Sequence, residues 1–259
     1  MKNSEPAVLY QQARATQTRV GILGVAVDLA SAEGLEGLSI GRLATELRMS
    51  KTGIFAHFGS KEQLQLATVG AAKEVFLEQV VKPSLDNLRG LPRLKAMLES
   101  WLGYVERIVF RGGCFFAAAS AEFDSRPGKV RDEIASLTKA WLRALEAEAA
   151  FAQKEKQIKG SIVPAQLAFE LHAYVQEANW AFKLFDDKSA FHRARRAISD
   201  RLAEASRGLR NRKPKRKDVV HERVKQRAAT TIENGAAGQR LILPIGIHRY
   251  RRIRRSQRG

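Results

Sequence analysis

Residues 38–64 read LSIGRLATELRMSKTGIFAHFGSKEQL, and their pattern predicts two short helices joined by a tight turn. In the first helix, apolar residues recur at the spacing of one helical face, at Ile40, Leu43, Ala44 and Leu47. Residues 48–50 interrupt this pattern, and a second helix is expected over residues 51–57. Two helices separated by a short turn, with supporting helices on either side, match a helix-turn-helix.

Serine residues stand where these helices should begin. The hydroxyls of Ser39 and Ser50 can each accept a hydrogen bond from a backbone N–H that the first helical turn leaves without a partner. Ser60 is followed three residues later by Gln63, which is the pattern of a capping box. Ser60 should therefore begin a longer helix, which we expect to link the motif to the rest of the chain over about residues 61–82.

The chain before this motif is expected to hold one more helix. Residues 1–15 are polar and contain a proline, so we expect a flexible arm there. From about Thr18, apolar residues follow helical spacing, at Val20, Leu23, Val27 and Ala30. This helix should stop near Glu33, because Gly34 can take the left-handed conformation that closes a helix. The helix-turn-helix domain then covers residues 16–62.

The chain after the motif also has helical patterns, which are broken at clusters of glycine and proline. These clusters are Gly90-Leu91-Pro92, Arg111-Gly112-Gly113, Arg126-Pro127-Gly128 and Gly160 to Pro164. Apolar stripes mark the last two helices, at Ala168, Leu171, Val175, Ala178 and Phe182, then at Phe191, Ala194, Ile198, Leu202 and Ala205. No β-hairpin pattern is found, so the fold class is all-α, with a second helical domain over residues 83–206. Its stripes must be buried by the domain's own core or by a second subunit.

The net charge of +18 comes mainly from the end of the chain. Residues 207–259 contain 17 Lys and Arg against three acidic residues, a net charge of +14, while residues 1–206 carry only +4. Basic blocks at residues 210–217 and 249–255 repel themselves, so we expect a disordered tail. The tail is either an extension that adds affinity for nucleic acid or one without a function, such as the product of a shifted reading frame.

Composition and motifs exclude several other classes of protein. The chain is 44% hydrophobic and can bury a core, yet no apolar run approaches the roughly 20 residues of a membrane span. Without a signal-peptide pattern we expect a cytoplasmic protein, associated with the nucleoid. The single cysteine, Cys114, excludes an internal disulfide and a cysteine-based metal cluster. Because nothing in the sequence pairs Cys114 with His172, and no Gly-rich phosphate loop is found, we expect no enzyme, no cofactor and no metal.

The stretch from Arg19 to Leu64 resembles the TetR family of bacterial transcriptional regulators. The matching residues are Ile22-Leu23, Ala26, Gly34, Leu38-Ser39-Ile40, Leu43-Ala44, Met49-Ser50-Lys51, Ile54-Phe55, His57-Phe58, Ser60-Lys61-Glu62 and Leu64. Later runs at residues 110–116, 168–171 and 179–182 look like the ligand-binding domain of one subgroup. The resemblance covers about residues 14–206. It implies an all-helical homodimer whose N-terminal domain binds double-stranded operator DNA and whose C-terminal domain binds an effector.

In a helix-turn-helix, the second helix enters the major groove with its N-terminal half against base edges. Ile54 and Phe58 suit packing inward, which leaves the DNA side of this helix to Lys51, Thr52, Gly53, Ala56 and His57. Family members commonly carry tyrosine, whose hydroxyl reaches a phosphate, where this chain has Phe55. Phe55 therefore stays among the DNA-binding candidates of this helix, but we expect it to pack rather than to bind phosphate. Phosphate contacts are expected from helix N-termini and nearby cations, at Arg19, Ser39, Ser50 and Lys61.

The second domain contains aromatic and polar residues of the kinds that line effector sites. The candidates are Trp101, Tyr104, Cys114, Phe116, Phe123, Trp141, His172 and Trp180. The alternative is that these residues form the core, since aromatic residues at helical spacing usually do. The sequence thus predicts a homodimeric repressor, paired through helices near residues 165–206 and released from its operator by a small molecule. The alternatives are an activator, an effector-independent regulator, and a nonspecific nucleoid-type nucleic-acid-binding protein.

Overall fold

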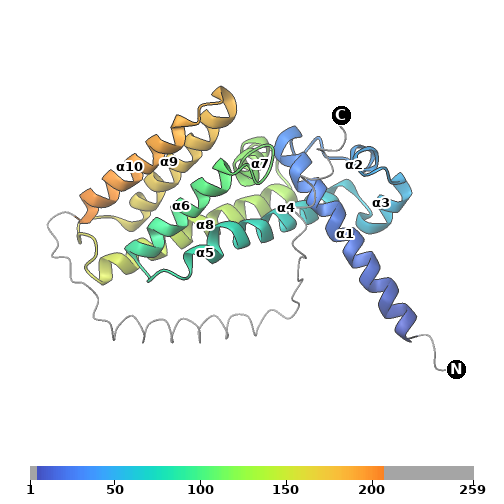
Figure 1. Cartoon of the computed structure of the whole chain (residues 1–259), viewed down its shortest axis with the longest axis horizontal. Helices are drawn as coiled ribbons and strands as arrows, with labels where there is room; N and C mark the ends of the chain where they lie inside the picture. The colour runs from blue at the N-terminus through green and yellow to red at the C-terminus, as the bar shows by residue number, and fades with distance from the viewer. Residues whose placement is uncertain (1–4, 207–259) are drawn as a thin grey trace, which may run out of the picture. The chain divides into compact units, whose positions relative to one another are not determined.

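The computed structural model describes residues 5–206, and this part of the chain consists of helices and their connections, without a strand (Figure 1). The all-α prediction is therefore confirmed. The described chain divides into residues up to Gly24 and a second unit from Val25 onward. The expectation of a disordered basic tail falls on residues 207–259, which lie outside the described residues.

Helix α1 (Glu5–Glu33) begins much earlier than the sequence predicted. The expected flexible arm is wrong for residues 5–15, which are helical. This segment is rich in Ala, Gln, Leu and Arg, which favour helices, and proline is tolerated in a first helical turn. The end of α1 is where the sequence placed it, because Gly34 takes a φ of +90°.

The two short helices of the predicted motif are α2 (Ile40–Leu47) and α3 (Lys51–Phe58). The Ser39 hydroxyl accepts a hydrogen bond from the backbone N–H of Arg42, at 3.1 Å. The Ser50 hydroxyl accepts one from Gly53, at 3.0 Å. These contacts confirm both serine caps, and α3 ends one residue later than expected.

The linking helix starts as predicted but is not regular to its end. The Ser60 hydroxyl accepts a hydrogen bond from the N–H of Gln63 at 3.1 Å, and α4 (Lys61–Phe76) follows. After Phe76 the chain widens into a π-helix, η1 (Leu77–Val81), before the short α5 (Lys82–Ser84). The hydrophobic pattern did not reveal this wider turn.

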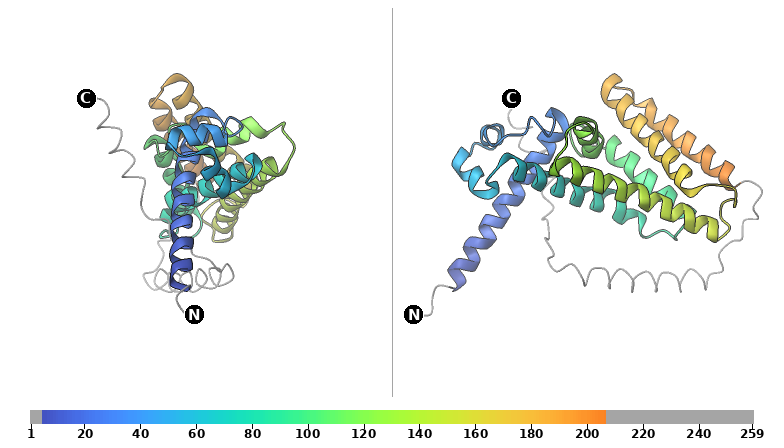
Figure 2. Two further views of the ribbon diagram at one scale, coloured as in Figure 1. Left: turned by 90° about the vertical axis from the view of Figure 1, so that its right-hand side faces the viewer. Right: turned by 180° about the vertical axis from the view of Figure 1, so that it is seen from behind.

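Five more helices follow in the described chain, four of them at or just after the predicted breaks and the last one after Asp186-Asp187. They are α6 (Leu91–Glu106), α7 (Phe115–Phe123), α8 (Lys129–Lys154), α9 (Pro164–Phe185) and α10 (Ser189–Ser206). Helix α8 packs against α4, α6, α7 and α9, and α10 lies beside α9, as Figures 1 and 2 show from several sides. All ten residues of the two predicted apolar stripes on α9 and α10 are buried. These stripes therefore face the core of their own domain.

The connection between α6 and α7 passes close to the end of α1. The backbone N–H of Gly112 donates to the Ser31 hydroxyl at 3.1 Å. A Cβ atom on Gly112 would lie 1.6 Å from the backbone oxygen of Ser31, which is far inside van der Waals contact. Only a residue without a Cβ atom allows the two backbones to approach this closely.

Replacing Gly112 with alanine should therefore destabilise the protein by about 3 kcal/mol, because the backbone of one segment must move. Gly70 in α4 provides the control, since a Cβ there meets nothing within 4 Å. Gly70→Ala should raise stability by about 0.5–1 kcal/mol through helix propensity. Urea unfolding at a fixed protein concentration measures both changes. Equal midpoints for Gly112→Ala and the unchanged protein would contradict the prediction.

Candidate functional site

Helix α3 has one buried and one exposed face. Ile54 and Phe58 are buried, while Lys51, Thr52 and Ala56 are exposed and Gly53 and His57 are half-buried. The expectation that Phe55 packs inward is wrong, because its side chain is 53% exposed. Phe55 lies four residues after Lys51 and so shares its exposed side, next to the buried face that Ile54 and Phe58 form.

Two cations near these helices, Lys61 and Arg42, are already engaged with acidic side chains. Lys61 Nζ lies 2.7 Å from Glu36 Oε1, and this bond is the main reason that the pKa of Glu36 is lowered. Arg42 contacts Glu33 at 2.7 Å and Glu46 at 3.0 Å. A phosphate group at Lys61 would therefore have to compete with a carboxylate.

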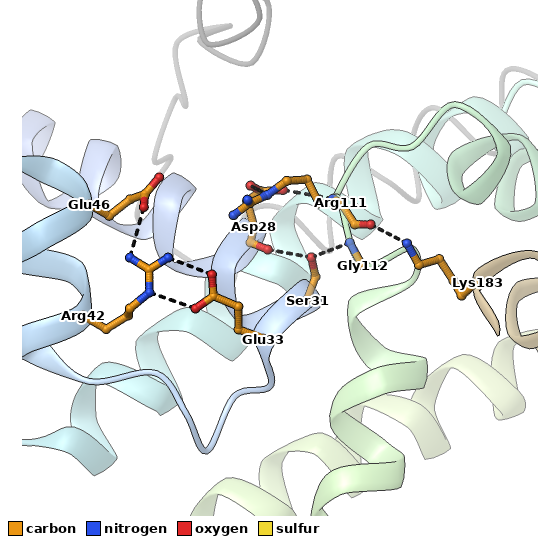
Figure 3. A network of polar contacts seen from close by, with 8 residues as sticks. All are labelled: Asp28, Ser31, Glu33, Arg42, Glu46, Arg111, Gly112 and Lys183. Carbon is orange, nitrogen blue, oxygen red and sulfur yellow. Dashed lines mark hydrogen bonds and ion pairs between the residues drawn. The ribbon is translucent and has the colours of Figure 1, made fainter. Parts of the chain in front are cut away.

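A polar network joins the end of α1 to the helices that follow the motif (Figure 3). Arg111 Nε lies 2.6 Å from Asp28 Oδ2, and the backbone N–H of Arg111 donates to Asp28 Oδ1 at 3.0 Å. Lys183 of α9 donates to the backbone oxygen of Arg111 at 2.6 Å. The α6–α7 connection is thus held between α1 and α9.

A second polar contact ties the turn after α1 to α7. The carboxylate of Glu122 accepts hydrogen bonds from the backbone N–H groups of Leu35, at 2.7 Å, and Glu36, at 3.1 Å. On the other side of the α6–α7 connection, the backbone N–H of Cys114 donates to Asn179 Oδ1 of α9 at 3.0 Å. The motif is therefore fastened to the second domain at more than one point.

Five aromatic side chains meet where α4 ends. The ring of Phe76 lies 5.0 Å from Trp141, 6.0 Å from both Tyr104 and Phe116, and 6.2 Å from Trp101, measured between ring centroids. All four contacts are close to edge-to-face, the arrangement that aromatic rings prefer. We call these five residues the aromatic cluster.

The titratable groups around the aromatic cluster are neutral at pH 7. Burial raises the pKa of the Tyr104 hydroxyl and of the Cys114 thiol, so both stay protonated. Burial lowers the pKa of His172, whose ring lies 5.1 Å from that of Trp101. A protonated thiol is a weak nucleophile, so this environment does not activate Cys114 for catalysis.

Within residues 5–206, no helix is long and apolar enough to cross a membrane. The same part of the chain holds no group of three or more metal-ligating side chains.

Two family descriptions match the chain, one over the helix-turn-helix and one over the helices from α6 to α10. Residues 22–68 match the N-terminal domain of "Bacterial regulatory proteins, tetR family", and residues 90–198 match a "Tetracyclin repressor-like, C-terminal domain". The chain belongs to the TetR family. It is a DNA-binding transcriptional regulator with a C-terminal ligand-binding domain. No curated protein matches the chain in sequence.

Solved TetR-family structures share this fold. A TetR transcriptional regulator from Chloroflexus aurantiacus is 21% identical, with a TM-score of 0.69, over 74% of this chain and 97% of that one. AibR was solved in complex with isovaleryl coenzyme A and operator DNA. It is 25% identical, with a TM-score of 0.57, over 73% of this chain and 98% of the AibR chain. The regulatory protein TetR from Rhodobacter sphaeroides is 20% identical, with a TM-score of 0.61, over 70% of this chain and 97% of that one.

The structure brings together most, but not all, of the site residues that the sequence proposed for this TetR-family chain. Trp101, Tyr104, Phe116 and Trp141 belong to the aromatic cluster, and Cys114 and His172 lie beside it. Phe123 is buried elsewhere on α7, where Arg126 lies over its ring at 5.8 Å. Trp180 is 50% exposed and packs on Phe185, on the outer face of α9. Arg19 is half-buried in the first unit, and its contact with phosphate stays a prediction.

Sequence reasoning missed two residues of this region. Phe76 lies at the centre of the aromatic cluster, but it sits on the helix that was assigned only a linking role. Gln176 has a buried side-chain oxygen without a hydrogen-bond partner. Its position four residues after His172 places both side chains on the same face of α9, and this spacing is the signal that could have identified it.

The lowered pKa of His172 makes stability depend on pH. The unfolded chain takes up a proton near the ordinary pKa of 6.5, whereas the folded chain resists it, so stability should fall as the pH drops from 7.5 to 5.5. In His172→Gln this loss should be smaller. The acidic groups with lowered pKa titrate below this window and do not obscure it. Urea unfolding at the two pH values measures the loss of stability in each protein. Equal losses in the unchanged protein and in His172→Gln would show that His172 is not the group responsible.

Proposed function

We propose that this TetR-family regulator is a homodimeric repressor that leaves its operator when a small molecule binds at the aromatic cluster. The observation that carries the proposal is the course of α4. This helix starts directly after α3, at Lys61, and ends at Phe76, inside the aromatic cluster. A helix of 16 residues spans about 24 Å, so a displacement at one end reaches the other.

The proposed DNA-binding surface is the exposed face of α3 and the helix N-termini around it. Lys51 and Thr52 stand in the first turn of α3, where side chains reach base edges and phosphates. Ser39 and Ser50 cap helices whose N-terminal N–H groups attract phosphate oxygens. The domains follow the same division, with DNA binding over residues 16–62 and effector binding and dimerisation over residues 83–206.

Effector binding must favour one arrangement of the two domains to change DNA affinity. Besides α4, the α6–α7 connection supports this coupling, because Arg111 contacts Asp28 on one side and Lys183 on the other. AibR, which has a similar fold, was solved with a small molecule and operator DNA together. We propose the same two kinds of partner for this chain, which then acts on the nucleoid in the cytoplasm.

The outer face of α9 is the proposed surface for the homodimer. Its exposed apolar side chains are Phe169, Trp180, Leu184 and Phe185. Large exposed apolar side chains gathered on one helix are typical of protein interfaces. The buried face of the same helix already packs on its own core, so this outer face remains for a second copy.

Footprinting on the DNA upstream of the chain's own gene, at stepped salt concentrations, tests the proposed function. A dimeric repressor should protect one inverted repeat with half-sites about 34–36 Å apart, or a multiple of this distance. Uniform protection along the fragment would instead support the nonspecific nucleoid-type alternative. A discrete site that no small molecule can release would support an effector-independent regulator.

Two substitutions on α3 test its orientation on DNA. Lys51→Ala should reduce the slope of log K against log salt by about 0.9 for each phosphate that Lys51 neutralises. Phe55→Tyr adds a hydroxyl on the same exposed face and should tighten operator binding by about tenfold, through a hydrogen bond to phosphate. Lys61→Ala should change the slope less than Lys51→Ala, because Glu36 already neutralises Lys61. Fluorescence anisotropy with operator DNA measures all three, and an unchanged slope for Lys51→Ala would remove Lys51 from the interface.

A charge on the outer face of α9 should separate the subunits. Leu184 is 61% exposed, and Leu184→Lys would bring two like charges into the proposed dimer interface. Sedimentation velocity should then show a monomer with an unchanged helical circular dichroism spectrum. Leu85→Lys is the control, because Leu85 is also exposed but lies after α5, away from α9. A dimer that survives Leu184→Lys would place the interface elsewhere.

A further inference from the structure

We infer that the effector is an uncharged, flat molecule that carries both a hydrogen-bond acceptor and a hydrogen-bond donor, held by Trp101, Trp141 and Gln176. This inference rests on the proposed function, which places the effector at the aromatic cluster. It goes further by naming the chemistry of the ligand and the side chains that select it.

Three buried polar atoms in this region have no hydrogen-bond partner. They are Trp101 Nε1, Trp141 Nε1 and Gln176 Oε1, and they are the only such side-chain atoms found within residues 5–206. Trp101 Nε1 faces the sulfur of Cys114, which is a weak acceptor and leaves the indole N–H unsatisfied. A buried polar group without a partner costs about 1–3 kcal/mol, so three together point to a missing partner.

These three side chains stand on three different helices, and two of them are in contact. The rings of Trp101 on α6 and Trp141 on α8 have centroids 5.6 Å apart and are nearly perpendicular, at 85°. His172 of α9 lies 5.1 Å from the Trp101 ring, and Gln176 follows it by one helical turn on the same face. The unsatisfied atoms therefore belong to α6, α8 and α9, three helices that pack on one another.

The types of these atoms define the ligand. An indole N–H can only donate, so Trp101 and Trp141 require an acceptor oxygen or nitrogen. The carbonyl oxygen of Gln176 requires a donor, such as a hydroxyl or amide group. The rings of Phe76 and Phe116, which pack edge to face, give this region an aromatic and apolar character that favours an aromatic ligand.

The same region disfavours a charged ligand. The side chains that meet here are aromatic, sulfur-containing or amide groups, and Tyr104, Cys114 and His172 are neutral at pH 7. Moving an ion from water into such surroundings, without an opposite charge, is costly. The desolvation that holds His172 neutral would act on a ligand cation or anion in the same way.

Calorimetric titration of the full-length dimer with matched probes tests this inference. One set is 2-naphthol, 2-methoxynaphthalene and naphthalene-2-carboxylate, and the other is phenol, anisole and benzoate. In at least one set, the hydroxyl compound should bind about tenfold more tightly than the methoxy compound, which keeps the acceptor but lacks the donor. The carboxylate should bind at least tenfold more weakly than the hydroxyl compound. The inference would be overturned if the carboxylate bound as tightly as the hydroxyl compound, or if no compound of either set bound.

Substitutions identify the atoms involved. Gln176→Leu should weaken the binding of the hydroxyl compound about tenfold, because its donor loses its partner. The affinity for the methoxy compound, which has no donor, should stay unchanged. Trp141→Phe keeps an aromatic ring but removes the N–H, and should weaken both compounds by a similar factor. Trp180→Phe is the control, since Trp180 lies exposed on the outer face of α9. Identical affinities in all three variants would show that these atoms do not contact the ligand.

The outcome can be separated from that of the proposed function. Probe binding is measured without DNA, and operator release is measured afterwards by anisotropy with the same probes. Binding without release would leave the ligand chemistry standing and contradict the repressor mechanism. Release by charged molecules alone would support the repressor and overturn the ligand chemistry.

Discussion

The packing of Phe76 among four other aromatic rings fixes the end of α4, and the relation between the two domains depends on it. Helix α4 begins at its Ser60 cap, directly after α3. The position of the other end of α4 therefore determines the position and orientation of α3. The polar contacts of Arg111 and Glu122 hold the same two parts together from another side. Helix α4 is therefore restrained at both ends, and a small molecule bound as proposed would act on it.

The sequence was sufficient for much of the fold because the decisive signals are local. Ser39, Ser50 and Ser60 cap helices through bonds within four residues, and the glycine and proline clusters stop helices whatever surrounds them. The start of α1 was missed because a proline near a chain end was interpreted as a break, although a first turn accepts it. The π-helix was missed because its wider turn leaves no mark in hydrophobic spacing.

The site was harder to predict because it depends on contacts between distant segments. The apolar ring of Phe55 suggested packing, yet its position beside the buried face of Ile54 and Phe58 leaves about half of the side chain exposed. Trp180 is an aromatic residue of the kind that lines ligand sites, but its position on α9 places its side chain away from the core. Conversely, nothing in the sequence marks Gln176 as a site residue. Only the structure shows that its side-chain oxygen is buried without a hydrogen-bond partner.

The π-helix at Leu77–Val81 determines which side chains after Phe76 face the core. One residue more than a regular α-helical turn is accommodated there, and a single residue corresponds to a rotation of about 100° around a helix axis. The wide turn holds the extra residue locally, and Phe76 before it and Val80 within it are both buried. The chain can therefore hold one additional residue at this point without rotating the segment that follows.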